Sequence, residues 1–361
     1  MLSSEQISQA VTQAATDAGF ELSGVARVEE ADFPELNAFV EWIEAGHAGE
    51  MHYLARRTES GELKRASARN AAPWVRSVIV CGLNYNTDQP YSTRVSDPAR
   101  GWISRYAWGK SDYHHALHER LQKVEAALRD LSSLHNLAVQ TLSYVDTGPL
   151  VERVYARYAG LGWIGKNTCL IHQKLGSFFF LGVILTSLEL PPALPAADRC
   201  GSCTRCIDAC PTQAIIAPGK LDARRCIAYL TIEKRGEMPA EFRDAVGHHL
   251  FGCDICQDVC PWNNKPGNAM PTSAPEFQAQ PQMFHPDLQW LASLDEEAFR
   301  QKFRDSPVKR AKYSGLRRNA AVAMGNSGNK KFLPDLERLS ADPDAVVAEH
   351  ARWALDKLRS S

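Results

Sequence analysis

The feature that most constrains this 361-residue chain is the crowding of its cysteines, since eight of the ten lie between Cys200 and Cys260. The first four form the pattern CxxCxxCxxxCP, from Cys200 to Pro211, which is the run that binds 4Fe-4S clusters in bacterial ferredoxins. Three more follow as CxxCxxxCP up to Pro261, and Cys226 lies between the two runs. Two 4Fe-4S clusters need eight thiolates, so the spacing predicts two clusters in this segment.

In the ferredoxin run the fourth cysteine binds the other cluster, so the ligands of the two clusters interleave. One predicted cluster is bound by Cys200, Cys203, Cys206 and Cys260, and the other by Cys210, Cys226, Cys253 and Cys256. Zinc stays open as an alternative, although zinc sites use paired CxxC motifs with longer separations. Disulfides suit a small secreted protein better than a long chain without a signal peptide.

Charge and hydropathy argue against a membrane or a general polyanion partner. The formal net charge is −1, and the longest apolar run, Phe178 to Leu185, is far shorter than the roughly 20 residues of a membrane span. The N-terminal residues show neither a charged segment before an apolar stretch nor paired arginines. We therefore expect a cytoplasmic protein that does not interact with membranes.

Hydrophobic patterning divides the chain into three parts. Apolar runs predict three strands, at Ser77–Gly82, Val139–Val145 and Phe178–Ser187. Between the first two, apolar residues at helical spacing predict a helix over Tyr113–Leu131. Strands alternating with helices favour an α/β (α+β) domain over residues 1–190. Proline-rich stretches flank the cysteine segment, which indicates a ferredoxin-like domain over residues 191–265. From Ser314 onward, helical segments separated by short polar breaks predict an all-α module over residues 285–361.

The glycine-rich segment GLGWIGKN, residues 160–167, satisfies GxGxxG and nearly satisfies the phosphate-binding pattern GxxxxGK[ST]. A dinucleotide fingerprint must follow a strand and open a helix, whereas the helical stretch Leu150–Tyr158 precedes this one. Asn167 also replaces the hydroxyl residue that would bind magnesium. We therefore do not predict nucleotide binding, and the glycines indicate close approach of the backbone to another group, such as a large flat cofactor.

Asp146 ends the predicted strand Val139–Val145 and is followed by Thr147, Gly148 and Pro149. Ligand sites of α/β sheets gather at the carboxyl ends of strands, which makes Asp146 a candidate acid. The alternative is that Asp146 caps the helix that opens after Pro149, and spacing alone favours this capping role.

Taken together, YVDTGPLVER (residues 144–153), GWIGKNT (residues 162–168), CxxCxxCxxxCP and CDICQDVCPWN (residues 253–263) resemble the epoxyqueuosine reductase family. The resemblance covers nearly the whole chain. It implies a cobalamin-binding α/β domain, a ferredoxin-like domain with two 4Fe-4S clusters and a C-terminal HEAT-like repeat that binds tRNA. The implied reaction reduces the epoxide of epoxyqueuosine, at the wobble position of tRNA, to the alkene of queuosine.

The resemblance also implies roles for particular residues. The family's catalytic acid corresponds to Asp146. Contacts to cobalamin are implied for Arg57, Tyr106, Asp146, Lys166, Asn167, Ser177, Gly252 and Asp254. Arg153 is expected to contact the substrate.

A local run of basic residues between Ser306 and Lys331 contains no acidic residue. By itself such a run is more often a solvated helix face, but beside a tRNA-modifying domain phosphate contact becomes the better interpretation. The tRNA contacts predicted from this run are Lys309, Arg310, Arg317 and Arg318.

Removing an epoxide oxygen as water needs two electrons and two protons, while each cluster passes one electron at a time. A cobalt corrin can accumulate the reducing power, and Asp146 is predicted to protonate the departing oxygen. We expect a monomer supplied by an external electron donor, with the epoxyqueuosine in the tRNA anticodon loop as substrate.

Two other functions compete. A reductive dehalogenase of small organohalides also pairs cobalamin with two 4Fe-4S clusters, but the chain has no twin-arginine signal and carries a helical tail. A ferredoxin-type electron carrier without enzymatic activity would leave the whole stretch before Cys200 without a purpose.

Overall fold

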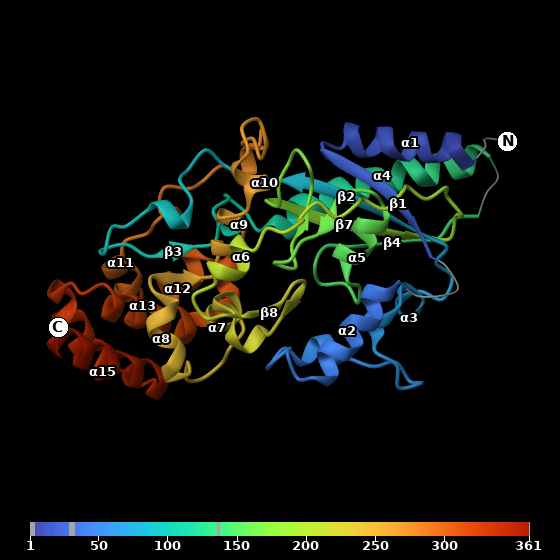
Figure 1. Cartoon of the computed structure of the whole chain (residues 1–361). Helices are drawn as coiled ribbons and strands as arrows, with labels where there is room; N and C mark the ends of the chain where they lie inside the picture. Colours follow the sequence, from blue (N-terminus) through green and yellow to red (C-terminus); the bar gives the residue numbers. More distant parts are fainter. Residues whose placement is uncertain (1–3, 29–32, 136–137, 361) are drawn as a thin grey trace. The chain divides into compact units, whose positions relative to one another are not determined.

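A computed structural model of the protein describes residues 4–28, 33–135 and 138–360, whose helices and strands are labelled in Figure 1. The chain forms two compact units, each assembled from three separate stretches. We call the first the sheet unit (residues 1–86, 114–203 and 261–271) and the second the helical unit (residues 87–113, 204–260 and 272–361). Neither unit is one continuous segment of the chain.

The sheet unit is built on four strands, and all three neighbouring pairs run antiparallel. In spatial order the strands are β1 (Leu22–Arg27), β2 (Ser77–Asn84), β7 (Phe179–Thr186) and β4 (Thr141–Tyr144). The three predicted strands are confirmed, as is a mixed α/β fold. However, the rule that places ligands at the carboxyl ends of strands applies to parallel sheets, so it gives no support to Asp146 here.

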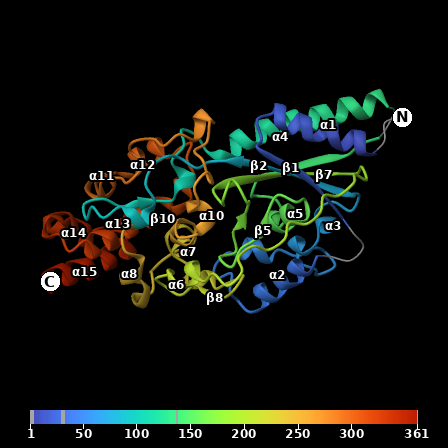
Figure 2. The ribbon, with the colours of Figure 1, turned by 45° about the horizontal axis from the view of Figure 1, so that its top comes forward.

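Helices cover both faces of this sheet, which explains why the two central strands, β2 and β7, are almost continuously apolar. Every residue of β2 is buried. Val80 and Val183 share a core with residues of α5 (Glu152–Tyr158), whereas Gly182 faces Leu121 of α4 (Tyr113–Leu134). Figures 1 and 2 show α1 (Ser4–Asp17) and α4 on one face and α5 on the other. An alternating pattern would appear only if one face were solvated.

Shorter elements complete the sheet unit. They are α2 (Pro34–Glu44), α3 (Ala68–Ala71), α10 (Pro261–Asn264) and the antiparallel pair of β5 (Trp163–Ile164) with β6 (Leu170–Ile171). The predicted helix from Tyr113 is confirmed and runs to Leu134.

The helical unit contains the cysteine segment and the C-terminal helices. Its strands form the parallel pair β3 (Trp102–Ile103) with β10 (His249–Phe251) and the antiparallel pair β8 (Ile215–Ala217) with β9 (Lys220–Leu221). Short helices carry or follow the cysteines, namely α6 (Arg205–Asp208), α7 (Ile227–Ile232), α8 (Ala240–Val246) and α9 (Ile255–Asp258).

The helical segments predicted from Ser314 onward are confirmed as α13 (Lys312–Asn326), α14 (Leu333–Ser340) and α15 (Ala345–Ser360). Two further helices, α11 (Leu288–Ser293) and α12 (Glu296–Lys302), precede them. α13 and α15 pack closely, because a Cβ on Gly325 would lie 2.9 Å from the Cα of Ala354. These helices share one hydrophobic core with Trp102 and Phe251, so they are stabilised by the rest of their unit.

Candidate active site and cluster-binding segment

Asp146 lies in a tight turn directly after β4. Its backbone φ is +57°, in the left-handed region that residues other than glycine seldom adopt, and Thr147 N donates a hydrogen bond to Val145 O. The Asp146 side chain is 60% exposed, and its Oδ2 lies 3.9 Å from Nε2 of His114. A strained turn that presents an acid to solvent is typical of functional sites.

The capping alternative for Asp146 is not supported. The helix that follows, α5, begins at Glu152, and its N-cap residue is Val151, which makes no side-chain capping hydrogen bond. The turn is tight for another reason, because a Cβ on Gly148 would lie only 2.4 Å from Cγ of the Tyr144 side chain. The segment therefore holds Asp146 away from the helix end and toward solvent.

Glu152, the first residue of α5, is an acidic neighbour of Asp146 that the sequence reasoning missed. Burial, with a smaller contribution from the negative charge of Asp146, raises the pKa of the Glu152 carboxyl from its ordinary 4.5 to about 8, although a hydrogen bond from its own backbone acts to lower it. Nearby Arg65 and Arg153 lower the pKa without cancelling these effects. Glu152 is therefore largely protonated at neutral pH. In the sequence it resembles any acidic residue in the first turn of a helix, a position that ordinarily favours the charged form.

The glycine-rich segment forms the β5–β6 hairpin after α5, which agrees with the context that argued against a nucleotide fingerprint. A Cβ on Gly162 would lie 2.3 Å from Ile171 O, so only glycine fits there. Lys166 Nζ donates to the carbonyl oxygens of Gly201 (2.7 Å) and Cys203 (3.0 Å). Lys166 thus fixes the start of the cysteine run.

Two further predicted contacts of the sheet unit are buried and held by hydrogen bonds. Asn167 Oδ1 accepts a bond from Cys169 N (3.2 Å). Ser177 N donates to Asn263 Oδ1 (2.8 Å), and Asn263 Nδ2 donates to Ser177 Oγ (2.9 Å). The end of the CDICQDVCPWN motif is therefore anchored beside the sheet.

Arg57 and Arg153 are exposed on the sheet unit. A terminal nitrogen of Arg57 donates to Gly61 O (2.7 Å), and one of Arg153 donates to Thr168 O. These bonds hold the Arg57 guanidinium beside its own turn and the Arg153 guanidinium, which extends from α5, beside the β5–β6 hairpin.

The remaining predicted cobalamin contacts belong to the helical unit. Asp254 is buried and its Oδ2 accepts hydrogen bonds from Trp102 Nε1 (3.0 Å) and Arg105 N (2.8 Å). Gly252 has φ +73°, and Tyr106 packs against Phe251 with ring centroids 5.9 Å apart. Asp254 therefore orders the backbone around the second cysteine run.

All ten cysteines lie in the described part of the chain, and there none is joined in a disulfide. Burial raises the pKa of the Cys253 thiol well above its ordinary value, and the charges of Cys226 and Cys210 raise it further. These three residues, predicted to bind one cluster, thus lie within electrostatic reach of one another. Among the described residues, no group of three His, Cys, Asp or Glu side chains is placed to hold a single metal ion.

The basic run near the C-terminus separates into exposed and buried residues. Lys309 and Arg310 are about half exposed and pair with Asp112 (3.0 Å) and Glu233 respectively. Arg317, only 10% exposed, pairs with Asp342. Arg318 is 1% exposed and donates three hydrogen bonds to the carbonyl oxygens of Leu230, Lys234 and Gly236. Arg318 therefore has no surface to offer a phosphate, which corrects the expectation drawn from the sequence.

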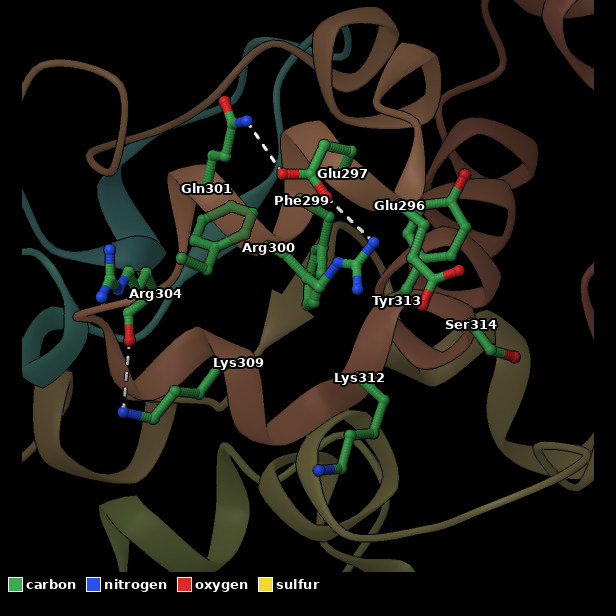
Figure 3. Close-up of a pocket in the computed structure, with 11 residues that line it drawn as sticks. Glu296, Glu297, Phe299, Arg300, Gln301, Arg304, Lys309, Lys312, Tyr313 and Ser314 are labelled. Carbon is green, nitrogen blue, oxygen red and sulfur yellow. Dashed lines mark hydrogen bonds and ion pairs between the residues drawn. The ribbon is translucent and has the colours of Figure 1, made fainter.

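A pocket of about 880 Å³ lies beside this run, between α12 and the start of α13 (Figure 3). Its apolar wall is formed by Phe299, Phe303 and Tyr313, and its basic side chains are Arg300, Arg304, Lys309 and Lys312. Within the part of the chain that the structure describes, the Lys312 side chain makes no hydrogen bond or ion pair, and Figure 3 shows it pointing away from the other lining residues. The pocket thus combines aromatic surface with available positive charge.

Comparisons with known proteins agree with this arrangement. A family model described as "4Fe-4S double cluster binding domain" matches residues 199–263, and one described as "Epoxyqueuosine reductase QueG, DUF1730" matches residues 65–147. The epoxyqueuosine reductase of Xanthomonas campestris pv. campestris is 41% identical over 345 residues, which cover 94% of this chain and 93% of the relative. That of a Synechocystis species is 43% identical over 303 residues, covering 82% and 98%. The chain belongs to the epoxyqueuosine reductase family.

Solved structures of epoxyqueuosine reductases have the same fold. One, a crystal structure with an epoxyqueuosine-modified tRNA-Tyr stem loop, gives a TM-score of 0.86 at 31% identity, covering 99% of this chain and 91% of that chain. Another, from Bacillus subtilis with a catalytic aspartate loop swung out of the active site, gives 0.84 at 30% identity with the same coverage. The family fold therefore comprises a mixed α/β part, a double-cluster domain and C-terminal helices. Among the described residues, no helix has the length and apolarity needed to cross a bilayer.

Proposed function

We propose that this chain reduces epoxyqueuosine to queuosine at the wobble position of tRNA. The observation that carries the proposal is the exposed, left-handed turn at Asp146 in a chain that matches epoxyqueuosine reductases over nearly its whole length. The related structure with an epoxyqueuosine-modified stem loop supports tRNA as the substrate. The chemistry would be divided among residues 1–190 for catalysis, residues 191–265 for electron transfer and residues 285–361, a HEAT-like repeat, for tRNA binding.

The eight clustered cysteines are proposed to hold two 4Fe-4S clusters. Their chemistry fits, because none is used in a disulfide and the family model for a double-cluster domain spans all eight. One cluster would be bound by Cys200, Cys203, Cys206 and Cys260, and the other by Cys210, Cys226, Cys253 and Cys256. An external donor would supply the electrons.

Cobalamin is the proposed second cofactor, and the glycine-rich hairpin fits a ligand of this kind. Trp163 is buried, and its indole Nε1–H has no acceptor among the described residues. Cobalamin carries amide side chains whose carbonyl groups could accept that bond. The proposed contacts to cobalamin are Arg57, Tyr106, Asp146, Lys166, Asn167, Ser177, Gly252 and Asp254. When bound, cobalamin would supply the low-valent metal needed to deliver two electrons to the substrate.

The protein's own contribution to the reaction centres on Asp146. Its carboxyl would protonate the oxygen that leaves the epoxide, and the left-handed turn presents that carboxyl outside the hydrogen bonding of the sheet. Arg153, exposed seven residues further along, would contact the substrate nucleotide.

Binding of tRNA would use the exposed basic residues near the pocket of Figure 3. Lys309 and Arg310 remain in this proposal, and Lys312 joins them because its side chain is exposed and makes no hydrogen bond or ion pair among the described residues. Arg317 and Arg318 are left out, since their guanidinium groups are used inside the helical unit. A wobble base must leave the anticodon stack to react, so recognition of loop shape suits this enzyme better than duplex reading.

The decisive experiment is anaerobic incubation of the protein with cobalamin, a strong reductant and tRNA bearing epoxyqueuosine, followed by mass analysis of the nucleosides. We expect queuosine to accumulate and a haloarene substrate to remain unchanged. Failure to form queuosine with both cofactors verified by their absorbance would refute the proposal.

A further inference from the structure

The Glu152 carboxyl lies near Asp146 and has no role in the reaction proposed above. Oε1 of Glu152 is shielded from solvent and has no hydrogen-bond partner among the described residues. An ionised carboxylate in such a place would carry a large desolvation cost. Because Glu152 is also close enough to sense the charge of Asp146, the two acids form one electrostatic site.

The charged groups around Glu152 come from three segments of the sheet unit. Asp146 precedes it on the same motif, Arg153 follows it, and Arg65 approaches from the segment before α3. Neither arginine is committed to the carboxyl by a described hydrogen bond, because Arg65 donates to Leu150 O (2.6 Å) and Arg153 to Thr168 O. Burial therefore prevails, and Glu152 keeps its proton at neutral pH.

The stoichiometry of the proposed reaction asks for such a group. Conversion of an epoxide to an alkene and water consumes two electrons and two protons, and a single carboxyl can deliver only one proton before it must be recharged. His114 is the other titratable side chain near Asp146, at 3.9 Å. Unlike His114, Glu152 belongs to the same motif as Asp146, YVDTGPLVER, and its carboxyl oxygen Oε1 is shielded from solvent.

We propose that Glu152 stores the second proton of the reaction and passes it to Asp146. This inference rests on the proposed function. Bound substrate covers the exposed Asp146 carboxylate, which favours uptake of a proton from solvent, and Asp146 then gives this proton to the oxygen as the first carbon–oxygen bond breaks. The O–H bond of Glu152 then breaks as an O–H bond forms on the Asp146 carboxylate, which moves one negative charge to Glu152. Asp146 delivers this second proton as the oxygen leaves as water, and solvent reprotonates Glu152, so no electron is exchanged between the two acids. Glu152 is thus a positioning residue that acts through Asp146.

The test is a pH profile of single-turnover reduction, measured with enzyme whose clusters and cobalamin have been reduced beforehand. The parent rate should fall as the pH rises through about 8, because Glu152 loses its proton there. The variant Glu152→Gln keeps the size of the side chain but cannot give up a proton in this way. At pH 7 its rate should be lower than that of the parent by about 10-fold or more, and the decline in rate at alkaline pH, the alkaline limb of the profile, should disappear. Glu152→Asp should restore part of the rate and the limb.

The matched control is Glu119→Gln, which removes an exposed carboxylate from α4 of the same unit and should behave like the parent. Cluster and cobalamin absorbance and tRNA affinity should be equal in all four proteins. Infrared difference spectra at pH 7 should show a protonated carboxylic acid in the parent that is missing in Glu152→Gln.

The outcomes separate the two proposals. If the parent forms no queuosine, the proposed function fails. If the parent is active but Glu152→Gln keeps its rate, or is slower with the alkaline limb unchanged, the proton-storage role is overturned.

Discussion

The turn at Asp146 and the helix α13 both concentrate charge, but they use it in opposite ways. At the turn, Asp146 is exposed on a strained backbone and the Oε1 atom of Glu152 has no hydrogen-bond partner among the described residues. In α13, Arg318 is buried and its guanidinium donates to three carbonyl oxygens. A charged residue whose hydrogen bonds are all made inside the fold has a structural role, whereas one left exposed or without a partner is available for chemistry. The sequence shows where the charges are but not which of these two situations applies.

The largest effect is expected from replacing the acid of the turn. Asp146→Asn keeps a residue that tolerates the left-handed backbone but cannot serve as the acid. Turnover of epoxyqueuosine-tRNA should fall about 10²- to 10⁴-fold, as measured by nucleoside mass analysis, with cluster absorbance and thermal midpoint unchanged. Normal turnover in this variant would show that Asp146 is not the acid and that the strained turn has no catalytic role.

The opposite outcome is expected for Arg318→Met. Three carbonyl oxygens lose their buried donor, so the free energy of unfolding should fall by about 3 kcal/mol or more. The rate per folded molecule should stay near that of the parent. The control Arg359→Met removes only an exposed ion pair with Glu337 and should cost less than about 1 kcal/mol. Equal thermal midpoints for the two variants would contradict a structural role for Arg318.

A smaller change should follow from the double variant Lys309→Gln with Lys312→Gln, which removes two exposed charges beside the pocket of Figure 3. Affinity for tRNA should fall several-fold, and the dependence of log Kd on log salt should become shallower by about 1–2. Filter binding at several salt concentrations measures both quantities. Lys123→Gln, on the exposed face of α4, is the matched control. An unchanged salt dependence would exclude these lysines from phosphate contact.

The last prediction concerns the dependence of stability on pH. The pKa of Glu152 is about 8 in the folded protein and ordinarily 4.5, so between these values the folded state binds more protons than the unfolded state. The contribution of this group to the free energy of unfolding therefore declines as the pH rises from about 4.5 to about 8. Glu152→Gln has no such dependence, so its thermal midpoint should exceed that of the parent by a growing margin over this interval. A margin that does not change with pH would show that Glu152 is solvated and ionised.

Individual helices and strands could be predicted well from the sequence, because each is determined by the spacing of apolar residues over a short stretch of chain. β2, β7 and α4 lie within a few residues of their predicted bounds, and the segment from Ser314 onward is helical as predicted. Strand order and direction could not be predicted this way, since pairing joins distant segments. The same limit explains the misjudged Arg318, whose backbone carbonyl partners precede it by more than eighty residues.

The candidate site was found through motifs and not through spacing. Asp146 was identified by the resemblance of YVDTGPLVER to a family, while spacing favoured a capping role that the structure does not support. Glu152 lies in the same motif but escaped notice, because its shifted pKa depends on burial, which no local pattern reveals.

Each unit is assembled from stretches that are far apart in the sequence, and this affects how the chain folds while the ribosome is still making it. Ile79 of β2 pairs with Ile184 of β7, and β7 emerges about 5–20 s after β2 at ordinary rates of translation. During that interval β2 has only β1 as a partner, although both of its faces are covered in the finished protein. A nascent chain at this stage exposes the edge of an apolar strand. Chaperones that bind such edges would therefore act on this protein before β7 has paired with β2 and the sheet unit is complete.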